Sequence, residues 1–202
     1  GQTVSVNSVT AGDTSLFATQ PAINSSGELT FTPAADASGS TTVTVAIQDN
    51  GATTNGGTDT ASNTFDIDIS DTTAPTVASS NPTDSSSGFP LADDLTITFS
   101  ETVNFGASGT IELRNTDSAS TVETFDVATQ SGSSGGSIGL SGDTLTIDPA
   151  SDLAAVTNYD LNIPSGAVAD TAASPNNFAG RTIDFETVNS EPSFANASSG
   201  TI

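Results

Sequence analysis

The stretch "GDTLTIDPASDLAAVTNYDLNIP", from Gly142 to Pro164, decides the fold class of this chain. Within it, apolar residues alternate with polar ones in two short runs, at Leu145 and Ile147 and then at Tyr159, Leu161 and Ile163. A side-chain period of two, bounded by turn-forming residues, is typical of half-buried β-strands. We therefore expect two strands here and no helix.

The same period recurs along the chain, at Val43, Val45 and Ile47, at Phe65, Ile67 and Ile69, and at Leu95, Ile97 and Phe99. No stretch shows a helical period, so the sequence predicts an all-β protein. The expected strands form two sets. The first covers residues 3–9, 16–18, 29–33, 41–48 and 63–69. The second covers residues 76–80, 95–99, 110–114, 124–128, 144–148, 158–163 and 181–186.

The two sets predict two β-sandwiches in tandem, of the Ig-like or cadherin-like kind, the first incomplete. Seven short strands are typical of an immunoglobulin-like sandwich, and we assign them to a domain at residues 71–188. Five strands in residues 1–70 make only part of a sandwich, with a core too small to be more than marginal alone. We read residues 189–202 as a linker and the start of a following module, so the fragment is expected to be out of phase with its repeats.

Tyr159 is the only tyrosine, and it begins the sixth strand of the second set. This is the position of a tyrosine corner, in which the hydroxyl bonds to the backbone a few residues upstream. The alternative is an ordinary core residue.

The charge is strongly one-sided. The 202 residues include 24 acidic and only two basic side chains, with no histidine, for a formal net charge of −22. Such a surface excludes nucleic acid and anionic membranes as partners. The carboxylates either keep the protein soluble or bind divalent cations, and the composition alone leaves both open.

Cysteine, methionine and tryptophan are absent, and no apolar run is long enough for membrane insertion. Without Cys or His there is no nucleophile–base pair, and no Gly-rich phosphate loop occurs, so we do not expect an enzyme. A carbohydrate-binding module is an alternative, although sugar sites usually need aromatic platforms and this chain has one Tyr and no Trp.

The N-terminal part, from Gln2 to Ile69, resembles the tandem-repeat cadherin-like modules of large bacterial surface proteins. The resemblance lies in "GELTFTPAADASG" at residues 27–39 and "QDNGATTNGGTDT" at residues 48–60. The pattern normally begins some thirty or more residues earlier, so the module is expected to lack its N-terminal strands.

The second part, from Asp71 to Thr187, resembles the bacterial Ig-like domain first described in surface-layer proteins. The resemblance lies in "DTTAPTVASSNPTD" at residues 71–84, "LTITFSETV" at residues 95–103, and the opening stretch. Together the two resemblances imply a secreted or cell-surface bacterial protein built of repeats, either an adhesin, an S-layer protein or a surface fibre. Neither family is catalytic.

The expected topology brings acidic residues to the linker. If the first strand of the second domain runs away from the linker, the second and sixth strands run back toward it. Glu101 then lies near Asp71, together with Asp170, Asn176 and Asn177 from the loop after the sixth strand. Oxygen ligands from several segments, without His or Cys, suit Ca²⁺. The alternative is that each acid caps a turn or faces water.

Asp49 and Asp59 are weaker candidate ligands. They flank the loop "DNGATTNGGTD", at the expected far end of the first module. There they could bind Ca²⁺ at the preceding linker, or simply form an Asp/Asn-Gly turn.

The expected function is a structural extender segment, stiffened by Ca²⁺ at its linkers, whose partners are neighbouring repeats or subunits. An alternative is a filament subunit in which residues from Pro192 to Ile202 donate a strand to a neighbour, with Phe194 and Ile202 inserted. An arbitrary fragment boundary would explain the same features.

Overall fold

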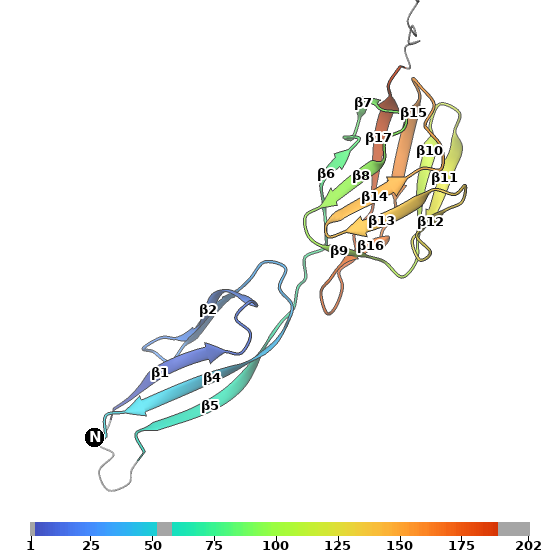
Figure 1. Ribbon diagram of the computed structural model, residues 1–202. Helices are drawn as coiled ribbons and strands as arrows, with labels where there is room; N and C mark the ends of the chain where they lie inside the picture. The colour runs from blue at the N-terminus through green and yellow to red at the C-terminus, as the bar shows by residue number, and fades with distance from the viewer. Residues whose placement is uncertain (1–2, 52–57, 190–202) are drawn as a thin grey trace, which may run out of the picture. The chain divides into compact units, whose positions relative to one another are not determined.

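The computed structural model describes residues 3–51 and 58–189 (Figure 1). These residues form strands, turns and loops with no helix, which confirms the all-β prediction. The chain folds into two compact units. Unit 1 comprises Gly1–Thr73 with Ala172–Asn176, and unit 2 comprises Ala74–Thr171 with Asn177–Ile202. The predicted tail at residues 190–202 and the middle of the "DNGATTNGGTD" loop lie outside the described residues.

Unit 1 contains a three-stranded antiparallel sheet and a separate hairpin. The sheet has the order β1-β4-β5, formed by β1 (Val4–Ala11), β4 (Gly39–Asp49) and β5 (Thr60–Ile69). The hairpin pairs β2 (Phe17–Ile23) with β3 (Leu29–Pro33). The pairing of β4 with β5 runs without a register shift from Gly39 opposite Ile69 to Gln48 opposite Thr60.

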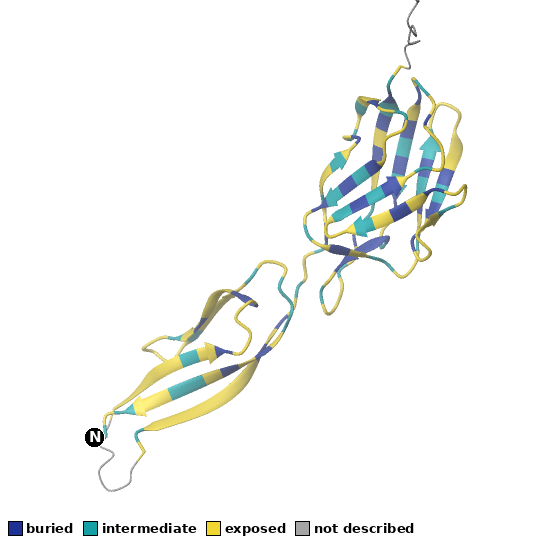
Figure 2. Ribbon diagram, viewed as in Figure 1, coloured by how far each residue is buried: buried dark blue, intermediate teal, exposed yellow. Residues whose placement is uncertain are grey.

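The core of unit 1 covers only one end of this sheet (Figure 2). Its buried apolar residues are Ala11, Leu16, Phe17, Val43, Ile67 and Ile69. Along the inner face of β4, Val43 is fully buried, Val45 is half-buried, and Ile47 is 37% exposed. Val4, Val6 and Phe65 are exposed as well. The apolar period of β4 and β5 is therefore that of a buried sheet, but half of the face has no cover among the described residues.

Unit 2 is a β-sandwich formed by one continuous ladder of strands in the order β6-β8-β14-β13-β12-β11-β10-β15-β17-β7. Figure 1 shows β8, β14 and β13 crossing in front of β17, β15 and β10. The strands of the front layer and its edge are β6 (Val77–Asn81), β8 (Leu95–Phe99), β14 (Thr144–Asp148), β13 (Ser137–Ser141) and β12 (Ser131–Gly132). The other strands are β11 (Ser120–Asp126), β10 (Thr110–Asn115), β15 (Asn158–Ile163), β17 (Arg181–Thr187) and β7 (Ser86–Phe89). A separate short pair joins β9 (Val103–Phe105) to β16 (Val168–Asp170).

The predicted period of two produces the core of unit 2. The alternating residues of the second set are all buried, among them Leu95, Ile97, Phe99, Leu145, Ile147, Leu161 and Ile163. Tyr159 is buried too, and its hydroxyl accepts a hydrogen bond from the backbone N–H of Ala154 at 2.9 Å. Its ring stacks on Phe185 at a centroid distance of 5.6 Å. The structure therefore confirms the tyrosine corner.

Unit 2 contains more strands than the seven predicted. The expected strand at residues 124–128 is β11, which begins earlier at Ser120, and β13 was not predicted at all. In unit 1, the strand expected at residues 16–18 extends to Ile23 as β2, across Pro21. Proline removes a backbone donor and argues against a strand in sequence, but it is tolerated in a ribbon of only two strands.

Glu123 of β11 joins three parts of unit 2 through one buried carboxylate. It is 2% exposed. Its Oε1 accepts hydrogen bonds from the backbone N–H groups of Ser134 (3.0 Å) and Gly136 (2.9 Å), and its Oε2 accepts one from Ala150 (2.8 Å). A side chain on Gly136 would place its Cβ 2.5 Å from the carbonyl oxygen of Asp148, so only glycine fits there. A buried charge is tolerated when several N–H groups bond to it, as they do here.

Candidate functional site

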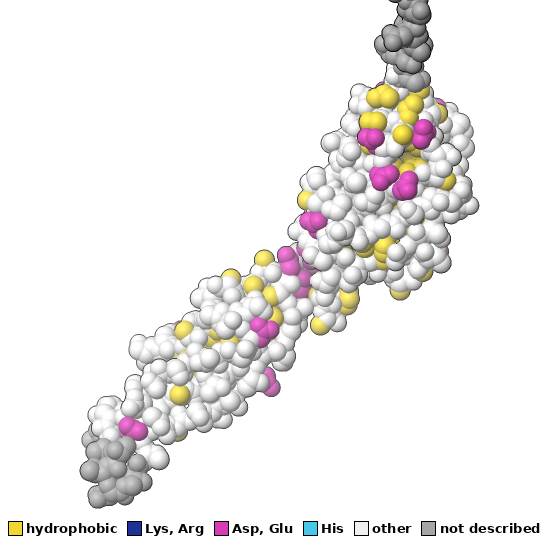
Figure 3. All heavy atoms as spheres, viewed as in Figure 1, with side chains coloured by type: hydrophobic (Ala, Val, Ile, Leu, Met, Phe, Trp, Pro, Cys, Tyr) yellow, Lys and Arg dark blue, Asp and Glu magenta, His cyan; other side chains and the backbone are white. Residues whose placement is uncertain are grey.

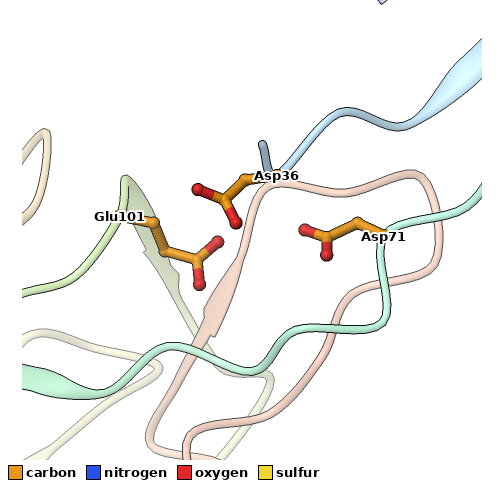
Figure 4. Close-up of side chains that lie close together, drawn as sticks. All are labelled: Asp36, Asp71 and Glu101. Carbon is orange, nitrogen blue, oxygen red and sulfur yellow. The ribbon is translucent and has the colours of Figure 1, made fainter. Parts of the chain in front are cut away.

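Asp36 and Asp71 of unit 1 have carboxylate oxygens within 4.8 Å of one another. Figure 4 shows the two side chains, Asp36 from the connection between β3 and β4 and Asp71 from the segment after β5. They come together because β4 begins opposite the end of β5, with Gly39 paired to Ile69. Residues 33–37 and 69–73 line a shallow depression beside the two carboxylates. The arrangement presents hard oxygen donors from two segments far apart in sequence.

The backbone and side chain of Asp71 also make hydrogen bonds. Its Oδ1 accepts one from the N–H of Thr73 at 2.8 Å. Its carbonyl oxygen accepts one from the side-chain amide of Asn176 at 3.2 Å, and both residues belong to unit 1. Asp71 and Asn176, two of the predicted ligands, are thus in direct contact. In that contact the amide nitrogen of Asn176 is the donor and points to Asp71.

Glu101, Asp170 and Asn177, the other predicted ligands near the linker, lie in unit 2. Glu101 follows the end of β8 and precedes β9, and Asp170 pairs with Val103 of β9. Asn177 forms a bridge with Ala169. The predicted topology thus places these three residues at the same end of unit 2. Asp170 is 2% exposed.

This end of unit 2 is also where the chain enters. The N–H of Ser100 donates to the carbonyl of Thr76 at 2.8 Å, which ties the start of the unit to the loop that carries Glu101. Glu101 is the third side chain labelled in Figure 4.

Asp49 and Asp59 lie together in unit 1, at the end of the sheet away from Asp71. The N–H of Asp49 donates to the carbonyl of Asp59 at 2.9 Å, and the Oδ1 of Asp49 accepts from Gly51 at 2.6 Å. Both residues line a hollow with Val4, Ile47 and Ala61. The bond from Gly51 to Asp49 is that of an Asp-x-Gly turn, whereas the carboxylate of Asp59 accepts from the side-chain amide of Gln48 at 3.2 Å.

Asp36 was missed by the sequence prediction. Its signal was present, because it stands in "GELTFTPAADASG" three residues after the predicted strand at residues 29–33. The connection between β3 and β4 lies at the end of the sheet where β5 ends, so an acid in that connection lies near Asp71. The prediction followed only the strands of the second domain and therefore overlooked it.

Several exposed acids of unit 2 bond to the protein itself. The Oδ1 of Asp84 accepts from the N–H of Asp184 at 3.1 Å, and its Oδ2 pairs with Arg181 at 3.0 Å. These contacts, the backbone bond first, lower the pKa of Asp84. Bonds from Asn158 lower the pKa of Asp117 in the same way. These carboxylates are held in place by bonds within unit 2.

Asp160, unlike Asp84 and Asp117, is in an environment that disfavours its ionised carboxylate. It lies on β15 between Arg114 of β10 and Asp184 of β17, and its Oδ1 is buried with no hydrogen-bond partner in the described structure. Desolvation raises the pKa of Asp160, against the attraction of Arg114.

Figure 3 shows that acidic side chains are exposed on one face of unit 2. Among the described residues, no helix is long and apolar enough to span a bilayer.

The family described as "Bacterial Ig-like domain" matches residues 71–187, so the chain belongs to that family. The family is one of non-catalytic modules. No curated protein matches the sequence. Among solved structures, the crystal structure of CopC from Methylosinus trichosporium OB3b is similar at 13% identity, over 58% of this chain and 96% of that one. Its TM-score is 0.40, and at that value the likeness supports no conclusion about this chain.

Proposed function

We propose that the chain is an extender segment of a secreted bacterial surface protein, such as an adhesin, an S-layer protein or a surface fibre. The observation that carries the proposal is the bacterial Ig-like domain at residues 71–187, directly preceded in the same chain by a second β unit. Modules joined in series hold a functional tip away from the cell. In this proposal unit 1 is a cadherin-like module.

The carbohydrate-binding alternative has less support. Sugar platforms usually are Trp or Tyr rings; the chain has no Trp, and Tyr159 is 3% exposed with its ring stacked on Phe185. No observation favours a sugar site over a spacer.

The proposal includes Ca²⁺ at the segment that joins the two units. Within unit 1 it is supported by the paired carboxylates of Asp36 and Asp71. Within unit 2 it is supported by the position of Glu101 and Asp170 at the end where the chain enters. Carboxylate oxygens without His or Cys suit Ca²⁺, and extracellular modules bind it with a Kd of roughly 10⁻⁴ to 10⁻³ M. A bound ion would also relieve the repulsion between Asp36 and Asp71.

Calcium titration of the whole chain tests the cation part of this proposal. We expect Ca²⁺ in the millimolar range to raise the Tm and to narrow the range of radii of gyration that fits the small-angle scattering. Because a net charge of −22 makes any cation stabilising through screening, the reference is Mg²⁺ at equal ionic strength.

Matched variants separate a specific site from this general screening. Asp71→Asn and Asp36→Asn should abolish the difference between Ca²⁺ and Mg²⁺, whereas Asp94→Asn, at an exposed acid of unit 2, should leave it unchanged. Equal responses to the two ions in the wild-type chain contradict the Ca²⁺ site but leave the extender role standing.

A further inference from the structure

The outer edge of β5 in unit 1 is long, has no bulge and has no proline, so its protection against pairing is limited to the charges of Asp66 and Asp68. β5 is ten residues long, pairs only with β4 in the described structure, and does so without a bulge. It contains no proline and no lysine. Edge strands are usually short, bulged, or protected by Lys or Pro, because an open edge is a template for another strand. By contrast, the edge strands of unit 2, β6 and β7, have five and four residues.

The inner face beside this edge is apolar and exposed. Phe65 of β5 and Ile47 of β4 are each 37% exposed, and Val4 is 64% exposed. Val4, Ile47 and Ala61 line the hollow at the end of the sheet. An added strand with apolar side chains on this face would bury them, at about 25 cal/mol for each Å² removed from water.

We propose that the edge of β5 binds residues 192–202 of a second copy of this chain as an added β-strand. That segment, "PSFANASSGTI", lies outside the described residues and contains no charged residue. In a chain with a net charge of −22 it can approach an acidic module without repulsion. If instead the β5 strands of two copies paired edge to edge, Asp66 and Asp68 of one copy would lie near Asp66 and Asp68 of the other. The repulsion between these carboxylates disfavours such a symmetric pairing.

The segment and the edge match in length and in pattern. Phe194 and Ile202 are an even number of residues apart, so on a strand they face the same side. Antiparallel pairing, the more stable kind, can set Phe194 opposite Ile69. The same register sets Ile202 opposite Ala61, beside the hollow that Val4 and Ile47 line.

Chain length assigns the segment to a second copy. The chain enters unit 2 at Ala74 and leaves it at Val188, at the opposite end, where the N–H of Val188 donates to the carbonyl of Phe89. Strands β6 and β7 need the residues from Val77 to Phe89 to cover that distance. Only three residues, 189–191, lie between Val188 and Pro192, and they reach at most about 11 Å, whereas the way back along unit 2 takes the residues from Val77 to Phe89. Each copy offers one tail and one edge, so the contacts form a closed ring or an open fibre according to the rotation that relates neighbouring copies.

Single-cysteine variants of the full chain test the register, since the chain has no native cysteine. Thr64 and Ser199 stand opposite one another in the proposed register and on the outer face of the sheet. A mixture of Thr64→Cys and Ser199→Cys chains should form the mixed disulfide in excess over either homodimer. The matched control mixes Ser199→Cys with Thr182→Cys, an exposed position on β17 of unit 2, and should give no such excess.

Sedimentation velocity across a concentration series tests the assembly. The wild-type chain should gain mass with concentration, and Phe194→Ser with Ile202→Ser should raise the apparent dissociation constant by about tenfold or more. Phe65→Ser should act in the same direction. Val122→Ser, which alters an exposed valine of unit 2, should have no effect.

The tail variants change none of the core residues that the structure describes, so they keep the test independent of any effect of Phe65→Ser on folding. A wild-type chain that stays monomeric at every concentration overturns the proposal, as does assembly that the tail variants leave unchanged. A mixed disulfide no more abundant than the homodimers overturns the register. The proposal does not depend on Ca²⁺, and both experiments are run in EDTA.

Discussion

The carboxylate of Glu123 and the backbone N–H of Gly136 lie 2.9 Å apart in the interior of unit 2, and glycine is required at position 136 for them to do so. Glu123 also bonds to Ser134 and Ala150, so a single side chain fixes the turn after β12 and the segment after β14. An acidic chain thus uses one of its carboxylates as an internal structural element.

Glu123→Gln should lower the free energy of unfolding by about 2 kcal/mol, because the amide nitrogen that replaces Oε2 faces the N–H of Ala150, leaving two donors opposed. Chemical denaturation at pH 7 measures the loss. Glu186→Gln, at a half-buried glutamate of β17, is the matched control and should stay close to wild type. Equal stability of the two variants would show that the network around Glu123 contributes nothing.

Tyr159→Phe should cost about 1 to 2 kcal/mol, because it removes the acceptor of the Ala154 N–H and keeps the stacked ring. Thermal unfolding of the variant provides the measurement. Phe185→Leu serves as a comparison that keeps the hydrogen bond and removes the stacking. A Tyr159→Phe Tm equal to that of the wild type would reduce Tyr159 to an ordinary core residue.

Asp84 should make unfolding depend on pH. Its pKa is lowered in the folded state by the Asp184 N–H and by Arg181, so its stabilising contribution is present above its unfolded pKa of about 3.9 and is lost as pH falls through the folded value. Asp84→Asn should therefore destabilise the protein at pH 7, by less than about 1 kcal/mol because solvent screens the pair, and should match the wild type near pH 2.

Urea unfolding from pH 2 to pH 7 measures this difference. Asp93→Asn, at an exposed acid of the same unit, is the control. A difference between Asp84→Asn and the wild type that is constant across this range would contradict the role of the ionised carboxylate.

Asp160 should change the free energy of unfolding at neutral pH in the opposite direction to Asp84. Its pKa is raised by desolvation, so the folded state favours the protonated form and the charged form is a cost at neutral pH. Asp160→Asn should raise the free energy of unfolding at pH 7 by less than about 1 kcal/mol, and the gain should vanish once pH falls below both pKa values. The free energy of unfolding, measured as a function of pH for Asp160→Asn and for the wild type, checks this prediction. A variant less stable than the wild type at pH 7 would mean that the attraction to Arg114 outweighs desolvation.

The sequence predicted well wherever side-chain period and burial coincide. Leu95, Ile97 and Phe99 alternate in the sequence and are all buried, and the position of Tyr159 predicted its hydrogen bond. β13 was missed because only Ile138 and Leu140 mark it between glycine-rich turns. Glu123 could not be found in advance, since an acid with three backbone donors looks in sequence like any exposed acid of a strand.

The candidate site was predicted only in part. Strand direction sufficed to place Glu101 and Asp170 at one end of unit 2. Asp36 depends on the pairing of β4 with β5 and on the path of the connection before β4, which no local pattern encodes. The approach of Asp36 to Asp71 is therefore a property of tertiary structure.

The unequal cores of the two units bear on how the chain responds to a pull. Unit 2 packs its strands around a large buried core, whereas the small core of unit 1 leaves Ile47 and Phe65 exposed. Under tension the less stable unit opens first. Its roughly 65 residues would then release about 220 Å of extended chain before unit 2 yields. Unit 1 would thus lengthen first under tension, and its unfolding would limit the force that unit 2 experiences.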